Sequence, residues 1–282
     1  MQSRCAWTFF LLVGCGSPVQ TTDDGGVQGN DAASPAQDSF VPFQPDDGGD
    51  AGACSPPDML VVLDRSDSMN RPSDGGDGGA SKWSLAVSAL DGITAAPIDG
   101  TLRFGLELLP DQEIKKGDAG ACASGLLSID PGLGNGAAIA STLASTQLMS
   151  GTPIAGALDV ARTTLAKEQI AGRGQNVLLV TDGKETCEGA SPLPVVQKLA
   201  GAGVSTYVVG FGGAVDAAML NDLACAGLTA KNFTNSCKKT SAGYVSNVLD
   251  TTHVYFDASS GGDLETALAT IASRTCCGCQ VN

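Results

Sequence analysis

Two kinds of apolar pattern alternate along this chain of 282 residues. In the first kind, apolar residues follow one another nearly without interruption, as in "MLVVLD" (59–64), "NVLLVTD" (176–182) and "VSTYVVGFG" (204–212). Such runs are typical of parallel strands that are buried on both faces. The segment "LRFGLELL" (102–109) instead carries leucine or phenylalanine at every second position, which predicts a strand with one apolar face.

In the second kind, apolar residues recur every three or four positions, which is the period of a helix with one buried face. Three segments show it: Trp83, Ala86, Val87, Leu90 and Ile93; Ile154, Ala157, Leu158, Ala161 and Leu165; and Leu264, Ala267, Leu268 and Ile271. Strands that alternate with helices predict an α/β fold. We therefore expect residues 54–282 to form a Rossmann-like domain, with an open, mostly parallel twisted sheet and helices on both faces.

The N-terminal 53 residues differ in composition from the rest. Arg4 precedes "CAWTFFLLVG", which is too short to span a bilayer and predicts a signal peptide over residues 1–14. The stretch ends in "LVGC", which resembles a bacterial lipobox and makes Cys15 the expected site of acylation; ordinary signal cleavage nearby is the alternative. Residues 15–53 hold seven Asp and no Lys, Arg or Glu, a composition that predicts a disordered tether.

Charge and composition exclude several classes of function. The formal net charge is −14, which disfavours nucleic acid and anionic membrane surfaces as partners. His253 is the single histidine, so general-base catalysis and His-ligated metals have little to draw on.

Apart from Cys5 and Cys15, the cysteines are Cys54, Cys122, Cys187, Cys225, Cys237, Cys276, Cys277 and Cys279. An even number in an exported chain favours disulfides. We expect Cys54 to pair with one of the three C-terminal cysteines, because domain ends often lie close together, and Cys225 to pair with Cys237. Cys122 and Cys187 are a further candidate pair. A soft-metal site in "CCGC" is less favoured, because it lacks a second CxxC and a nearby His.

Five oxygen-bearing residues follow strands or open helices: Asp64, Ser66, Ser68, Thr152 and Asp182. Each also has a simpler interpretation. The two serines and Asp182 are common turn residues, and Thr152 before Pro153 is a common helix N-cap. Taken together, two carboxylates and three hydroxyls suit an octahedral magnesium site at the carboxyl ends of the strands.

This arrangement resembles the metal-ion-dependent adhesion site (MIDAS) of von Willebrand factor type A domains, which is a DxSxS motif with a distant Thr and a distant Asp. The resemblance covers about residues 58 to 275. It implies that Ser66, Ser68 and Thr152 bind Mg²⁺ or Mn²⁺ directly, and that Asp64 and Asp182 bind it directly or through water. Two departures are Asp67, where the family usually has Gly, and the insert "RPSDGGDGGAS".

Four other functions compete with this one. A serine hydrolase lacks a G-x-S-x-G elbow and a placed base, and the single His falls on an expected late strand. A dinucleotide site in "SIDPGLGNGA" (128–137) lacks the third glycine, and a turn that closes an edge strand explains it better. A structural domain that does not use the metal remains an alternative, whereas a chelatase subunit conflicts with the export signal.

The sequence therefore predicts a non-enzymatic binding module, lipid-anchored to the outer membrane or surface of a bacterial cell envelope. Its expected partner is a protein or glycan that offers a carboxylate to the bound cation. Contact with the membrane is expected only through the lipid anchor, and no nucleic acid is expected.

Overall fold

The computed structural model describes residues 55–73, 79–95, 98–113 and 124–275, all within the unit Asp50–Asn282. The signal peptide and tether expected over 1–14 and 15–53, the acylated Cys15 and most of the "DGGDGG" insert therefore lie outside the described residues. The cysteines at 54, 122, 276, 277 and 279 lie outside them as well.

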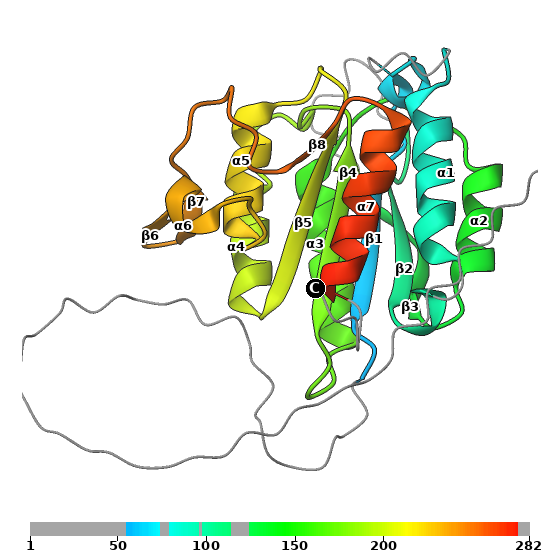
Figure 1. The fold of residues 1–282 in the computed structure, drawn as a ribbon, viewed down its shortest axis with the longest axis horizontal. Helices are drawn as coiled ribbons and strands as arrows, with labels where there is room; N and C mark the ends of the chain where they lie inside the picture. Colours follow the sequence, from blue (N-terminus) through cyan, green and yellow to red (C-terminus); the bar gives the residue numbers. More distant parts are fainter. Residues whose placement is uncertain (1–54, 74–78, 96–97, 114–123, 276–282) are drawn as a thin grey trace, which may run out of the picture. The chain divides into compact units, whose positions relative to one another are not determined.

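A six-stranded sheet in the order β3-β2-β1-β4-β5-β8 forms the centre of the fold (Figure 1). The strands are β1 (Asp58–Asp64), β2 (Arg103–Leu109), β3 (Leu126–Gly132), β4 (Gln175–Thr181), β5 (Val204–Phe211) and β8 (Phe256–Ala258). All neighbours are parallel except β2 and β3, which pair antiparallel. This confirms the predicted mostly parallel sheet.

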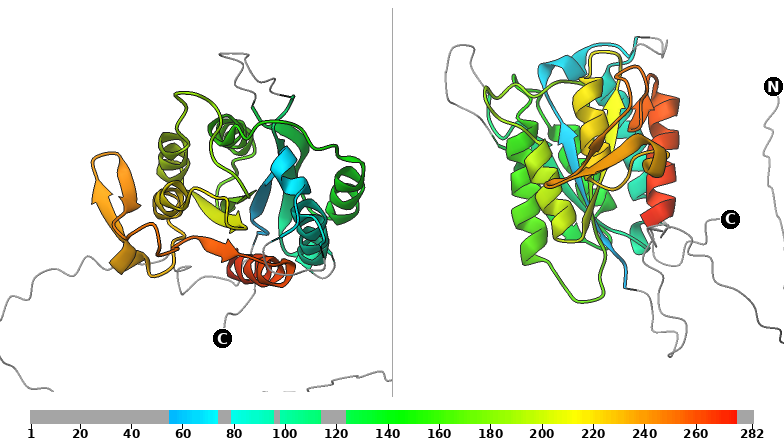
Figure 2. Two further views of the ribbon diagram at one scale, coloured as in Figure 1. Left: turned by 90° about the horizontal axis from the view of Figure 1, so that it is seen from above. Right: turned by 90° about the vertical axis from the view of Figure 1, so that its left-hand side faces the viewer.

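Helices cover both faces of this sheet, as the view from above shows (Figure 2). One face packs against α1 (Lys82–Thr94), α2 (Gly136–Ser145) and α7 (Gly261–Thr275). The other face packs against α3 (Ile154–Lys167), α4 (Leu193–Gly201) and α5 (Ala217–Ala226). Each buried strand contributes alternate side chains to the two cores, because successive side chains of a strand point to opposite faces. The three predicted helices are α1, α3 and α7, and their apolar faces lie in these cores.

Short elements complete the described chain: the 3₁₀ turns η1 (Asp67–Asn70) and η2 (Ile98–Gly100), the helix α6 (Phe233–Ser236), and the hairpin of β6 (Cys237–Thr240) and β7 (Gly243–Ser246). A disulfide between Cys225 of α5 and Cys237 of β6 ties the hairpin to the domain, as predicted. Cys187 is also disulfide-bonded, and its partner lies outside the described residues. The pairing of Cys187 with Cys122 and the pairing of Cys54 remain predictions.

No helix within the described ranges combines the length and the apolar character that a membrane span needs.

Candidate metal centre

The candidate site lies where two neighbouring strands of the sheet end. Asp64 is the last residue of β1, and Asp182 directly follows Thr181, the last residue of β4. The strands β1 and β4 pair side by side and in parallel, so both carboxylates lie at the same edge of the sheet. From β1 the chain continues to β2 on one side, whereas β4 lies on the other. This is a switch point of the strand order, where open α/β sheets bind ligands.

The loop after β1 is fixed by the buried side chain of Arg65. Its Nε donates to the carbonyl of Pro110 at 2.8 Å, and its Nη2 donates to the carbonyl of Asp111 at 3.2 Å. The backbone N–H of Arg65 also donates to the carbonyl of Leu109, at 2.7 Å. Arg65 therefore points away from Asp64 and ties the motif to the end of β2, so that Ser66 begins the turn in a defined position.

Backbone hydrogen bonds bring the segment before α3 alongside this loop. The N–H of Met149 donates to the carbonyl of Arg65, and the N–H of Asp67 donates to the carbonyl of Met149, both at 2.9 Å. Thr152, three residues further on, is 4% exposed. A Cβ placed on Gly183 would lie 3.3 Å from the Thr152 Oγ1 and 3.8 Å from the Asp64 Oδ2. The Thr152 hydroxyl and the Asp64 carboxylate thus face the same small space.

Hydrogen bonds connect four of the five candidate residues, namely Asp64, Ser66, Ser68 and Asp182. Asp64 Oδ1 accepts from the Ser66 N–H at 2.8 Å, and Asp64 Oδ2 accepts from the Thr181 hydroxyl at 2.6 Å. The Ser66 and Ser68 hydroxyl oxygens are 2.8 Å apart. The Ser68 hydroxyl donates to Asp182 Oδ1 at 2.6 Å. The structure thus brings together all five residues that the sequence singled out.

Two buried carboxylates at one point require compensation. Burial, with a smaller contribution from the negative charge of Asp182, raises the pKa of Asp64 to about 6, although the hydrogen bonds from Thr181 and Ser66 oppose the shift. The Asp182 side chain is 0% exposed, and its Oδ2 forms an ion pair with the ammonium of Lys82, the first residue of α1. Removing an ionised carboxylate from water is costly unless a positive charge is near, so this position favours a cation.

The donor set fits a hard divalent cation. Carboxylate and hydroxyl oxygens are the ligands that Mg²⁺ and Mn²⁺ prefer. A hydroxyl that donates its hydrogen to a carboxylate keeps lone pairs for a metal. The described residues contain no group of three or more His, Cys, Asp or Glu side chains placed to hold a metal.

One interpretation from the sequence is corrected here. Thr152 is not the N-cap of α3: that position is Pro153, and Glu185 Oε2 instead accepts from the N–H of Ala155 at 2.7 Å. The Thr152 N–H donates to the Thr186 hydroxyl at 2.7 Å. The Thr152 hydroxyl is therefore not used by the helix end. Asp67, which stands where the family usually has Gly, begins the 3₁₀ turn η1 and is exposed.

The competing interpretations gain no support. His253 lies in the loop before β8, not on a strand, where it contacts Asp257 at 3.1 Å. The side-chain hydrogen bonds of Ser66 and Ser68 in the described structure connect them to each other and to Asp182. The stretch 128–137 is an antiparallel edge strand, β3, followed by a turn into α2. It is therefore the turn that the simpler interpretation predicts.

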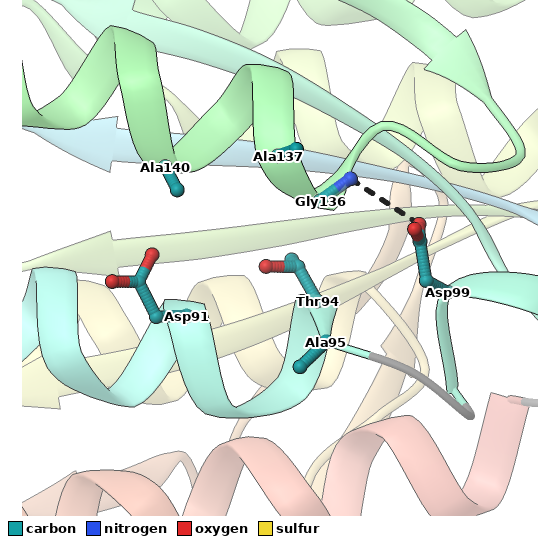
Figure 3. Close-up of a pocket in the computed structure, with 7 residues that line it drawn as sticks. All are labelled: Asp91, Thr94, Ala95, Asp99, Gly136, Ala137 and Ala140. Atoms are coloured by element: carbon teal, nitrogen blue, oxygen red, sulfur yellow. Dashed lines mark hydrogen bonds between the residues drawn. The ribbon is translucent and has the colours of Figure 1, made fainter.

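A cavity of about 270 Å³ lies between α1 and α2, at the opposite end of α1 from Lys82 (Figure 3). Its lining includes Asp91 and Asp99, and Asp99 Oδ1 accepts from the N–H of Gly136 at 3.3 Å. A Cβ at Gly136 would lie 2.2 Å from the carbonyl oxygen of Thr94, so the close approach of the two helices requires glycine. The hydrogen bond to Gly136, the first residue of α2, gives the Asp99 carboxylate a structural role.

Comparison with protein families supports the resemblance. The model of the von Willebrand factor type A domain matches residues 132–246, which include Thr152 and Asp182 but begin after the "DRSDS" segment. That match and the fold of the sheet together support the prediction that the chain contains a von Willebrand factor type A domain. No curated protein sequence matches the chain.

Solved structures with the same fold include three at 14–17% identity. Proximal thread matrix protein 1 from the mussel byssus, with a zinc-occupied MIDAS motif, has a TM-score of 0.51 at 17% identity over 78% of this chain. A von Willebrand factor type A protein from Catenulispora acidiphila has a TM-score of 0.51 at 14% identity over 78% of this chain. The pilus adhesin SpaC from Lactobacillus rhamnosus GG has a TM-score of 0.50 at 15% identity over 78% of this chain. The chain spans 46%, 43% and 30% of their lengths, respectively.

Proposed function

We propose that this protein is a non-enzymatic binding module of the bacterial cell envelope, which recognises a partner through a divalent cation held by Asp64, Ser66, Ser68, Thr152 and Asp182. The single observation that carries the proposal is the convergence of these side chains at the adjacent ends of β1 and β4. Two of the similar folds belong to proteins named as an adhesin and as a thread matrix protein with a metal-occupied MIDAS, which agrees with such a role.

Each residue has a distinct part in this proposal. Asp64 and Asp182 supply negative charge, and the hydrogen bonds from Thr181 and Ser68 hold their carboxylates in place. The hydroxyls of Ser66, Ser68 and Thr152 supply neutral ligands without adding charge. When Mg²⁺ or Mn²⁺ is bound, it supplies an electrophilic position for a carboxylate of a protein or glycan partner. The two carboxylates at most neutralise the ion, so an anionic partner is still attracted.

Calorimetric titration of the purified protein with Mn²⁺ tests the metal site. We expect saturable binding of one ion per chain, and capture of partners from the native envelope that is lost in EDTA and restored by added Mg²⁺. A folded protein that takes up no Mg²⁺ or Mn²⁺ at about millimolar concentration would show that the alternative is right, namely a structural domain that does not use the metal.

The attachment to the envelope is a separate part of the proposal. The "LVGC" segment leads us to expect that residues 1–14 are removed and that Cys15 becomes the acylated N-terminus. The intact mass of the protein isolated from its native membrane should then exceed that of residues 15–282 by the mass of the lipid. An unmodified N-terminus downstream of Cys15 would contradict this anchor, and the metal site would be unaffected.

A further inference from the structure

Lys82 is a charged residue next to the candidate site that is not among the five metal ligands predicted from the sequence. Its residue is 5% exposed, and its ammonium contacts Asp182 Oδ2, whose side chain is 0% exposed. The other oxygen of the same carboxylate accepts the hydrogen bond from Ser68. The Lys82 ammonium therefore lies against the carboxylate that the proposed function assigns to the divalent cation.

The position of Lys82 in its helix is an unfavourable one for a buried positive charge. It is the first residue of α1, directly after the N-cap Ser81. The N-terminus of a helix carries partial positive charge, so a cation is disfavoured there. A lysine is also rarely buried unless its charge is paired. Both costs apply to Lys82, and the described interaction that offsets them is the one with Asp182. Lys82 is thus placed as a counter-ion and not as an ordinary residue of a helix start.

We propose that Lys82 is an internal competitor of the divalent cation: its ammonium neutralises Asp182 until a metal ion enters, and metal binding requires it to move away. This inference rests on the proposed function and describes the regulation of that same site. A divalent cation next to Asp182 repels an ammonium that contacts the same carboxylate, since like charges at this range oppose each other strongly. The long side chain of lysine allows its charged end to reach water while its stem stays packed.

Competition of this kind has a functional consequence. The ammonium compensates the buried charge of Asp182 in the absence of metal, so this carboxylate does not require the metal to be buried. It also lowers the affinity for the metal, because every binding event must first break the ion pair. The site would therefore fill only at divalent cation concentrations above a threshold that Lys82 helps to set.

The test compares Mn²⁺ binding by the whole protein, by Lys82→Met and by the control Lys184→Met. Methionine keeps the length and the apolar stem of the lysine and removes its charge. Lys184 is an exposed lysine two residues after Asp182, so its removal changes the net charge near the site by the same amount. We expect Lys82→Met to bind Mn²⁺ about tenfold more tightly than the unchanged protein. We expect Lys184→Met to stay within about twofold.

Labelling of lysines with an amine-reactive ester, followed by peptide mass spectrometry, gives a second measurement on the unchanged protein. The label on Lys82 should rise when Mn²⁺ is added, whereas the label on Lys184 should not. This measurement needs no substitution, so it decides the question even if Lys82→Met does not fold.

The outcomes separate this inference from the proposed function. Equal or weaker Mn²⁺ binding by folded Lys82→Met, or Lys82 labelling that Mn²⁺ leaves unchanged or lowers, would overturn the competition while the metal site stands. Absence of binding in both proteins would overturn both proposals. Mn²⁺ binding by Lys82→Met but not by the unchanged protein would support the competition. It would also mean that the proposed site takes up Mn²⁺ only when the Lys82 charge is removed.

Discussion

Replacing Asp64 with asparagine is expected to weaken Mn²⁺ binding by at least about 100-fold, with the sheet still folded. Asp64 supplies one of only two carboxylates in the site, so the substitution halves its negative charge. Asparagine keeps the shape of the side chain, and its Oδ1 still accepts from the Ser66 N–H in place of the carboxylate. It also removes a buried charge whose ionisation is unfavourable, as the pKa raised to about 6 indicates.

Asp67→Asn is the matched control for this experiment. Asp67 lies three residues after Asp64 in the same motif and has the same charge, but it is exposed in the turn η1. Its charge is screened by water and salt, so we expect its loss to change Mn²⁺ affinity by less than about threefold. Ser66→Ala should fall between these two variants, because it removes a neutral ligand and no charge.

Calorimetric titration, with circular dichroism to show that each variant is folded, checks this order of affinities. Similar binding by Asp64→Asn and by the unchanged protein would place the metal elsewhere. Equal losses in Asp64→Asn and Asp67→Asn would mean that only the overall acidity of the loop attracts Mn²⁺.

The sequence predicted the sheet and the candidate ligands because both depend on local patterns. The strands β1, β4 and β5 are apolar on both faces and parallel, so all three end at the same edge of the sheet. Hydrophilic residues directly after such strands must therefore meet at that edge. The sequence therefore predicts that Asp64 and Asp182, which are 118 positions apart, lie close together.

The residues that the sequence did not reveal act through contacts between distant segments. Lys82 follows an Asp- and Gly-rich insert, and nothing local indicates that its ammonium turns inward to Asp182. Glu185 lies in the loop after β4, and its carboxylate accepts from the N–H of Ala155 at the start of α3 and from the N–H of Cys187. The only sequence signal for the contacts of Glu185 was the segment "TDGKET" after β4, which is rich in side chains that accept hydrogen bonds.

The strand β2 illustrates a further limit of the alternating pattern. Its period correctly placed Phe104, Leu106 and Leu108 in one core. The pattern says little about the opposite face, where the polar residue Glu107 is also fully buried. β2 lies between β1 and β3, and α3 contacts both β2 and β3. An acidic residue was thus enclosed by neighbours that only the tertiary structure provides.

Glu107→Gln is expected to remove a pH dependence of stability that the unchanged protein should show between about pH 4.5 and about pH 9. Neither carboxyl oxygen of Glu107 has a hydrogen-bond partner among the described residues. Burial raises the pKa of this carboxyl from 4.5 to about 9. Glu107 is therefore protonated in the folded protein at neutral pH and ionised in the unfolded chain.

The sign of the effect follows from this difference. Folding must take up a proton once the unfolded carboxyl has ionised, so the contribution is fully favourable only below about pH 4.5 and decreases as the pH rises. The loss is about 1.4 kcal/mol for each pH unit, or about 3 kcal/mol at neutral pH. It ends near the folded pKa of about 9. Glutamine does not ionise, so the contribution of position 107 becomes constant.

Urea unfolding of both proteins at about pH 5 and about pH 8, with disulfides intact, measures this difference. We expect the free energy of unfolding of Glu107→Gln, relative to that of the unchanged protein, to rise by about 3–4 kcal/mol between the two pH values. The comparison of slopes cancels the fixed cost of burying the glutamine amide, which is present at both pH values. Asp159→Asn, on the exposed side of α3, is a control that also removes one carboxylate and should leave the pH dependence nearly unchanged. Parallel pH dependences in the unchanged protein and Glu107→Gln would mean that Glu107 is charged in the folded protein and has a cationic partner.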